Sequence, residues 1–340
     1  MIGWNLASFE VATPDGITMR AALYDRHGSA GEVMRVEEVA TPEPGPGEVR
    51  VKVSCSGINP TDWKSRAGMT PRPIDGFQIP HHDGAGVIDA VGEGVGTERI
   101  GQRVWVWLAA AGRRWGTAAE WTVVPAEQAV PLPERHSFEL GACLGVPAVT
   151  AHRCLFADGP VDGKTILVAG GAGAVGHFAI ELAKFYGARV VTTVSGPEKA
   201  ELAKNAGADL VVNYRDASAV EEIRAFGPVD RIVEVALGAN LQLDLAVLKP
   251  LGEIVTYAAE PDDPALPVRA CMNANVILRF VLLYGVPREA LEHAASDITA
   301  VLTSGALTEL PVHKFSLDEI VAAQDAVQNG AVGKVLIAHA

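Results

Sequence analysis

Apolar residues in the first part of the chain fall in short runs that Gly and Pro interrupt. Between about residues 33 and 124, three of these runs are rich in β-branched and other strand-forming residues, at 49–54, 86–91 and 103–108. Short strands bounded by turn residues are typical of antiparallel sheets. This region is therefore predicted to form a compact, mainly antiparallel barrel or sandwich.

The pattern changes after about Gly141, where predicted strands and helices alternate regularly. The predicted strands cover residues 165–169, 189–194, 210–213, 229–235 and 253–257. The predicted helices cover residues 174–186, 197–206, 217–226 and 240–248. Such alternation predicts a parallel sheet with helices on both faces. Near the end, a predicted helix at 317–330 and strand at 334–339 could return to the first domain.

A glycine-rich turn follows the first strand of this alternating region. Gly171, Gly173 and Gly176 have the spacing GxGxxG and lead into the helix AVGHFAIELAKFYG. Glycines at these positions allow a tight turn, close approach of a pyrophosphate to the backbone, and close packing of helix on strand. Because the turn lies between a strand and a helix, with more βα units behind it, it predicts dinucleotide binding.

The residues after the second strand bear on the choice of dinucleotide. Ser195 lies 19 residues after Gly176, about where an NAD-binding site has a carboxylate for the ribose hydroxyls. No acid is present there, and Lys199 follows. A carboxylate would repel a 2′-phosphate, whereas a hydroxyl and a cation suit it. The sequence therefore favours NADPH over NADH; the alternative is that Lys199 is a solvated helix residue.

Composition excludes several classes of function. The 340 residues include 28 Lys and Arg against 41 Asp and Glu, a formal net charge of −13, so nucleic acid is not expected as a partner. The four cysteines form no CxxC or CxxH cluster. This argues against a zinc ribbon and a disulfide framework, and favours a reducing cytoplasm.

The sequence predicts no membrane partner. Residues 1–19 contain no basic residue and no continuous apolar run, so they are not interpreted as a signal peptide. The most apolar long window, residues 166–183, contains His177 and Glu181. We interpret it as a buried strand followed by a helix.

Several motifs occur in an order that is typical of one superfamily. They are GINPTDWKSRAG (57–68), IPHHDGAGVIDAVGEGV (79–95), VGHFAIELAK (175–184), EKAELAKNAGADLVVNY (198–214) and GKVLIA (333–338). With them, the chain from about Met19 onward resembles the medium-chain dehydrogenase/reductase superfamily, specifically its zinc-independent, zeta-crystallin-like quinone oxidoreductase branch. The resemblance implies an α/β fold. A GroES-like, mainly antiparallel β-barrel domain would cover residues 1–142 and 288–340, and a doubly wound parallel-sheet Rossmann domain residues 143–287.

The resemblance also bears on metal binding. Zinc alcohol dehydrogenases of this superfamily hold the catalytic metal with a Cys, a His and a second Cys. Here Asn59 and Val146 stand at the two Cys positions, and only His82, followed by Asp83, is kept. The four-cysteine structural lobe is also absent from the sequence between residues 92 and 115. No metal is therefore expected, and His82 is interpreted as a residue of the site wall.

The resemblance assigns cofactor contacts to individual residues. The pyrophosphate would lie against Gly171, Gly173, Ala174, Val175 and Gly176, and the 2′-phosphate against Ser195, Lys199 and Tyr214. The nicotinamide end would contact Thr150, with Asn59, Tyr257 and Ala258 nearby. Related enzymes often have a Tyr two residues after the Asp of the first loop, where this chain has Lys64. This departure affects the expected substrate contacts.

The predicted chemistry is hydride transfer to quinones or α,β-unsaturated carbonyl compounds, which accept hydride with less help than a simple ketone needs. Asn59 would donate a hydrogen bond to the oxygen that gains charge, with water or His82 as the proton source. Asp62 is expected to fix the loop, because a carboxylate is a poor acid unless its pKa is raised. The pair His81-His82 could instead be structural, with one ring bound by backbone and the other by Asp83.

Two further functions stay open: an enoyl-thioester reductase, and a non-catalytic NADPH-binding sensor protein. A homodimer is expected from the resemblance. It would form by pairing of edge strands near residues 276–283, whose apolar run would otherwise expose a sheet edge. The alternative is that this run belongs to the core.

Overall fold

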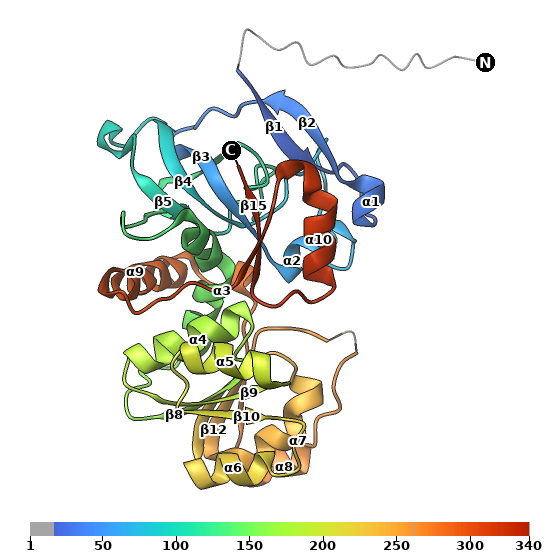
Figure 1. The fold of residues 1–340 in the computed structure, drawn as a ribbon, viewed down its shortest axis with the longest axis vertical. Coiled ribbons are helices and arrows are strands. Elements are labelled where there is room, and N and C mark those ends of the chain that lie inside the picture. Colours follow the sequence, from blue (N-terminus) through green and yellow to red (C-terminus); the bar gives the residue numbers. More distant parts are fainter. Residues whose placement is uncertain (1–16, 261, 340) are drawn as a thin grey trace, which may run out of the picture.

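The computed structural model describes residues 17–260 and 262–339. The interpretation of the N-terminus as lacking a signal peptide falls almost entirely on residues 1–16, outside the described residues. A mainly antiparallel sheet and a parallel sheet stand at opposite ends of the molecule, with helices between them (Figure 1). Within the described residues, no helix combines the length and the apolar character that crossing a membrane requires.

The parallel sheet has six strands in the order β10-β9-β8-β11-β12-β13. They are β8 (Thr165–Ala169), β9 (Arg189–Val194), β10 (Leu210–Asn213), β11 (Val229–Glu234), β12 (Leu248–Thr256) and β13 (Ile277–Phe280). All neighbours run parallel. The strand order reverses between β8 and β11, and ligands bind at such switch points in doubly wound sheets. The predicted doubly wound parallel sheet is confirmed.

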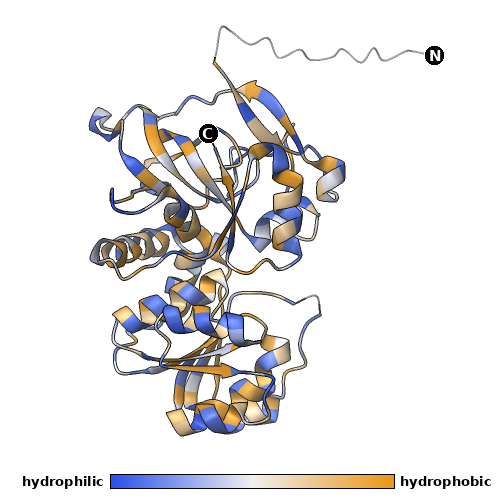
Figure 2. Cartoon of the chain, viewed as in Figure 1, coloured by the Kyte–Doolittle hydropathy of each residue, from blue (hydrophilic) through white to orange (hydrophobic). Residues whose placement is uncertain are grey.

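Helices cover both faces of this sheet. They are α3 (Phe138–Phe156), α4 (Ala174–Phe185), α5 (Pro197–Asn205), α6 (Ala219–Phe226), α7 (Leu237–Val247) and α8 (Val268–Ala274). Ile166 and Val168 of β8 pack into the core formed with α3 and α4, whereas Leu167 packs into the core formed with α6 and α7. Burial on both faces explains the continuous apolar runs, visible as orange strands in Figure 2.

The mainly antiparallel sheet has the order β14-β15-β3-β4-β5-β7, and β6 also pairs with β3. Its strands are β3 (Glu48–Ile58), β4 (Asp83–Val91), β5 (Arg103–Val106), β6 (Trp121–Pro125), β7 (Ala129–Pro131), β14 (Val312–Phe315) and β15 (Lys334–Ala338). The long β3 pairs with β4 along one edge and with β6 and then β15 along the other. The C-terminal strand thus returns to the first domain, and the predicted GroES-like antiparallel domain is confirmed.

Smaller elements complete the fold. They are β1 (Thr18–Leu23), β2 (Arg35–Ala40), α1 (Ala30–Val33), α2 (Pro60–Arg66), α9 (Arg288–Ser304), α10 (Ile320–Gln328) and the 3₁₀ turns η1 (Thr97–Arg99), η2 (Ala126–Gln128), η3 (Leu283–Gly285) and η4 (Leu317–Glu319). Helix α3 runs through the expected domain boundary after residue 142, so the two domains share it. The helix predicted at 240–248 begins earlier, at Leu237, and residue 248 instead opens β12.

Candidate active site

The glycine turn lies at the carboxyl end of β8, beside the switch point of the parallel sheet. Gly173 is the N-cap of α4, so the amides of Ala174 and Val175 belong to the first turn, where helix amides have no partner within the helix. A Cβ on Gly176 would collide with the carbonyl oxygen of Gly170. Close packing therefore excludes a side chain at Gly176 and leaves the exposed turn free to approach an anion.

Ser195 and Tyr214 follow the neighbouring strands β9 and β10, so both lie at the same edge of the sheet. Arg215 joins them. Its guanidinium donates to the carbonyl oxygen of Ser195 at 3.2 Å and lies 5.7 Å from the centre of the Tyr214 ring. Lys199 is on the first turn of α5, which begins from the loop that contains Ser195. This edge presents hydroxyls and cations, the groups that suit a phosphate.

Tyr257 and Ala258 follow β12, at the same edge of the parallel sheet. The amide of Tyr257 donates to the carbonyl oxygen of Glu234, the last residue of β11. Burial raises the pKa of the Tyr257 hydroxyl above its usual range. Thr150 is buried on α3, one turn after Val146. Tyr257 and Ala258 therefore lie beside the end of β11, and the contact of all three residues with the nicotinamide end stays a prediction.

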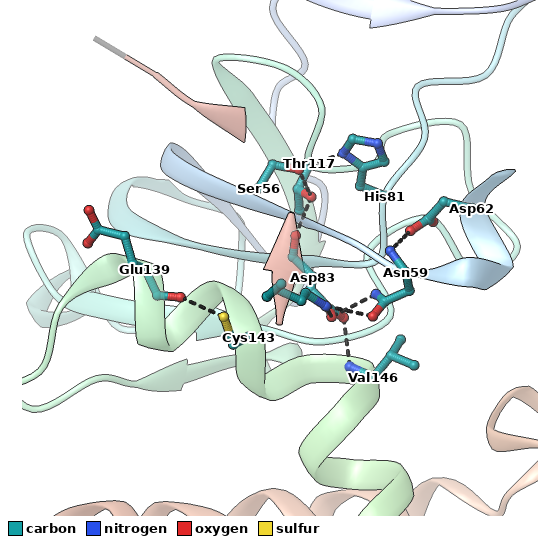
Figure 3. A network of polar contacts seen from close by, with 10 residues as sticks. Ser56, Asn59, Asp62, His81, Asp83, Thr117, Glu139, Cys143 and Val146 are labelled. Carbon is teal, nitrogen blue, oxygen red and sulfur yellow. Dashed lines mark hydrogen bonds and ion pairs between the residues drawn. The ribbon is translucent and has the colours of Figure 1, made fainter. Parts of the chain in front are cut away.

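A buried polar network joins the antiparallel domain to α3, and Asp83 is its centre (Figure 3). One carboxylate oxygen, Oδ1, accepts from the amide of Val146 at 2.7 Å. The other, Oδ2, accepts from the side-chain amide of Asn59 at 2.7 Å and from the ammonium of Lys334 at 3.0 Å. Lys334 also donates to Oδ1 of Asn59 at 2.6 Å. The charge of Asp83 is thus paired and hydrogen-bonded, as a fully buried carboxylate requires.

The backbone of α3 is adapted to this network. Pro147 inside the helix removes one amide donor and disturbs the regular hydrogen-bond pattern around it, and the amide of the preceding Val146 turns to Asp83. A Cβ on Gly145 would collide with Oδ1 of Asp83. Gly145 and Pro147 together therefore allow the carboxylate to reach the helix.

The two histidines of the PHHDG motif have different environments. His81 has φ of 77° and is held by Ser56, whose Oγ lies 2.9 Å from Nδ1, and by Gln324, 3.0 Å from Nε2. His82 packs on the ring of Tyr284, with 5.0 Å between ring centres, and its buried Nδ1 has no partner among the described residues. The alternative that backbone and Asp83 bind these rings is wrong as to the partners, because side chains bind His81 and the Asp83 carboxylate is bound by Asn59, Val146 and Lys334. Burial lowers the pKa of each histidine to about 3, so both are neutral at pH 7.

Asp62 is the predicted site residue whose pKa is brought close to neutral pH. One of its oxygens accepts from the amide of Asn59 at 2.7 Å, the loop-fixing contact expected of it. Burial is the main cause that raises the pKa of this carboxyl from 3.8 to about 7. Asp62, Arg72 and His82 line one cavity of about 30 Å³, enough to hold a water molecule.

Four residues of this region escaped the sequence analysis. Lys334 lies in a strand and gave no local sign of its long-range pairing with Asp83. Arg72 and Tyr284 come from a loop and from η3, and the Arg72 guanidinium lies 4.8 Å from the centre of the Tyr284 ring. Arg215 directly follows Tyr214, so its place in the cofactor motif could have revealed it.

Comparisons with known proteins agree with this arrangement. Residues 45–134 match the family described as "Alcohol dehydrogenase GroES-like domain", and residues 174–300 match "Zinc-binding dehydrogenase". The quinone oxidoreductase of Homo sapiens is 27% identical over 325 residues, which cover 94% of this chain and 97% of the human protein.

Solved structures are similar over the same extent. A mycobacterial quinone oxidoreductase is 29% identical, covers 94% of this chain and 100% of its own, and has a TM-score of 0.81. A mycobacterial structure complexed with NADPH is also 29% identical, with the same coverage and a TM-score of 0.80. The family resemblance in the sequence is thereby confirmed: this oxidoreductase chain belongs to the medium-chain dehydrogenase/reductase superfamily, in its quinone oxidoreductase branch.

Proposed function

We propose that this protein uses NADPH to reduce quinones or α,β-unsaturated carbonyl compounds, and that it does so without zinc. The observation that carries the proposal is the buried ammonium of Lys334, bound to Asn59 and Asp83. When bound, the dihydronicotinamide supplies a hydride, and one proton completes the two-electron reduction to a hydroquinone or a saturated carbonyl compound. The residues of the chain then have to bind, orient and protonate the acceptor.

The residues at the family's zinc positions do not fit a catalytic zinc ion. The Asn59 amide is engaged on both sides, by Lys334 and by Asp83, and Val146 offers no donor atom in its side chain. The Lys334 ammonium lies 2.6 Å from the Asn59 oxygen, and its positive charge would repel a divalent cation there. These observations favour chemistry that needs no Lewis-acid metal, as the sequence analysis expected.

The edge of the parallel sheet that presents Ser195, Lys199, Tyr214 and Arg215 is called the cofactor edge below. It fits NADPH. The exposed turn at Gly173 and the first-turn amides of α4 suit a pyrophosphate. Arg215, which is held against Ser195 and Tyr214, adds a guanidinium to the expected Lys199. A 2′-phosphate would gain charge-assisted hydrogen bonds at this edge that NADH cannot form.

The cavity lined by Asp62, Arg72 and His82 supports roles in the acceptor half of the reaction. Arg72 places a positive charge where oxygen charge would develop, and the remaining N–H of Asn59 or the ring of His82 could orient that oxygen. His82 is neutral, so it is a poor proton source. We assign the proton to Asp62, directly or through one water, because its raised pKa meets the requirement for an acid near pH 7.

The decisive experiment follows NADPH absorbance with chelator-treated protein and a para-quinone, an ortho-quinone, a cyclic enone or an enoyl thioester. We expect turnover with a quinone or enone, and a preference for NADPH over NADH of about tenfold or more. Turnover with the thioester alone would favour the enoyl-thioester reductase. NADPH binding without any turnover would favour the sensor protein.

Variants of the cofactor edge refine the same experiment. Lys199→Ala and Arg215→Ala should each raise KM for NADPH about tenfold and affect NADH far less. Lys204→Ala is the matched control, because Lys204 lies on the same helix but is exposed and paired with Glu201. An equal loss with both cofactors would contradict the assigned contact with the 2′-phosphate.

We also propose a homodimer, formed through β13, in the cytoplasm. β13 is the edge strand of the parallel sheet, and apolar side chains are exposed around it: Met272 at 69%, Phe280 at 71% and Leu282 at 69%. Exposed apolar edges invite strand pairing. The four cysteines are free, which fits a reducing compartment.

The dimer can be tested by sedimentation at micromolar concentration. We expect a mass of twice 35.7 kDa for the native chain, and the mass of one chain for the double variant Phe280→Lys/Leu282→Lys. Ile100→Lys is the control, because Ile100 is an exposed apolar residue of the other domain. A native chain that sediments as a monomer would exclude the proposed dimer.

A further inference from the structure

Two helices that meet at the domain junction bring two histidines and one carboxylate together. His152 is on α3, and His293 and Asp297 are one turn apart on α9, which packs against α3. Nε2 of His152 lies 2.8 Å from Oδ2 of Asp297, and Nε2 of His293 lies 3.6 Å from the same oxygen. All three donor atoms lie within 4.8 Å of one another.

These distances suit a common metal ion. With ligand bonds of about 2.0–2.1 Å, tetrahedral coordination separates neighbouring ligand atoms by about 3.4 Å. The two separations from the Asp297 oxygen lie on both sides of that value, and the two histidine nitrogens lie within 4.8 Å of each other. Two imidazoles and one carboxylate are a ligand set of known zinc sites, and they also bind other divalent first-row transition metals.

The environment of His152 favours ligation over charge. His152 is fully buried, and its ring packs on Phe156 with 4.7 Å between ring centres. Charging a buried ring is costly, whereas a neutral imidazole can give a lone pair to a metal ion. Nδ1 of His152 has no partner among the described residues, whichever nitrogen carries the proton.

The opposite side of the cluster is open to solvent. The His293 side chain is 68% exposed and that of Asp297 is 30% exposed. A metal held by three protein atoms would therefore keep its fourth position for water or another small ligand. A hydrogen bond between His152 and Asp297 would not by itself explain why the His293 ring also lies at this place, with its centre 5.8 Å from that of the His152 ring.

We propose that His152, His293 and Asp297 form a binding site for a divalent transition-metal ion, with Zn²⁺ as the preferred ion, that braces α3 against α9. The site is separate from the family's catalytic zinc position. His152 lies six residues beyond Val146, about 9 Å along the helix axis. Because α3 also contains Thr150, a bound ion would steady the helix that contacts the nicotinamide end in the proposed function.

The test uses full-length protein freed of metal by chelation. Titration with Co²⁺ should produce visible absorption bands that saturate at one ion per chain, and Zn²⁺ should displace them. His293→Gln should weaken binding at least about tenfold, since it removes one of three ligands. His293 is exposed, so this change leaves the core intact. His313→Gln, also at an exposed histidine, should bind as the native chain does.

Thermal unfolding gives an independent readout. Free Zn²⁺ at a concentration of about 100 times Kd should raise the Tm of the native chain by about 4 °C, and that of His293→Gln much less. Binding that is sub-stoichiometric, or equal in His293→Gln and the native chain, would overturn the proposed site. Neither measurement needs substrate. The metal site can therefore be disproved without affecting the proposed reductase function, and the reductase function can be disproved without affecting the metal site.

Discussion

Replacing Asp62 by Asn should lower kcat with a quinone or enone about 100-fold or more, because general acids contribute factors of that size. Asn at this position keeps an oxygen that can accept from the Asn59 amide, so the loop contact survives. The affinity for NADPH should change little, since Asp62 lies in the antiparallel domain and not on the glycine turn.

The pH dependence gives this prediction a specific signature. The pKa of Asp62 is about 7, so kcat for the native protein should fall as the pH rises above 7 and the acid loses its proton. Asp62→Asn should lack this limb, and Asp62→Glu should retain it at a shifted pH. An Asp62→Asn variant with native turnover and a native pH profile would remove Asp62 from the mechanism.

Asp62→Asn should lower the activity but raise the stability of the folded protein above pH 7. The folded-state pKa is raised from 3.8 to about 7, so the native state is favoured with Asp62 protonated. The resulting stability is present below about pH 4 and is lost as the pH rises through 7, with a limit of about 4 kcal/mol. Asp62→Asn should therefore be more stable than the native chain at pH 8 and similar at pH 4, measured by urea unfolding. If the ionised Asp62 carboxylate instead stabilised the fold, Asp62→Asn would be less stable than the native chain at pH 8.

The parallel sheet was predictable because the residues that indicate its strands and turns lie close together in the sequence. Strands β8, β9 and β11 are almost wholly buried, β8 (TILVA) is a nearly continuous apolar run, and the glycine turn directly follows it. Helix α3 was not predicted, because Gly145 and Pro147 have low helix propensity and tertiary packing overrides it. Helix α9 has an amphipathic pattern, because its buried residues recur every three or four positions, and this pattern is typical of a surface helix.

The candidate site was only partly predictable, because some of its contacts join residues that lie far apart in the sequence. Asn59, Asp62 and His82 lie in recognisable motifs, and the structure places all three around one buried region. Lys334 comes from the far end of the chain. It reaches Asn59 only because β15 pairs with β3 in a register that places Val335 opposite Ile58. Long-range registers of this kind leave no periodic signal in the sequence.

Replacing Lys334 by Met should reduce the free energy of unfolding by about 3–5 kcal/mol, the usual cost of leaving one charge of a buried pair unpaired. Met fills a similar volume but cannot donate a hydrogen bond. The fully buried Asp83 carboxylate would keep Asn59 and Val146 as donors and lose its counter-charge, and the Asn59 oxygen would lose its partner. Urea or thermal unfolding of the native and variant chains measures the effect.

A second substitution separates charge from packing. Asp83→Asn in the Lys334→Met background removes the unpaired charge, and the oxygen of the new side-chain amide can still accept from the Val146 amide. The double variant should therefore recover more than half of the loss. Lys314→Met is the matched control. Its side chain is 51% exposed and its ammonium pairs with Glu139, so its loss should cost far less stability than the loss of Lys334. If Lys334→Met cost no more than Lys314→Met, the buried pair of Lys334 and Asp83 would not stabilise the fold, and the buried charge would no longer speak against a zinc ion at this place.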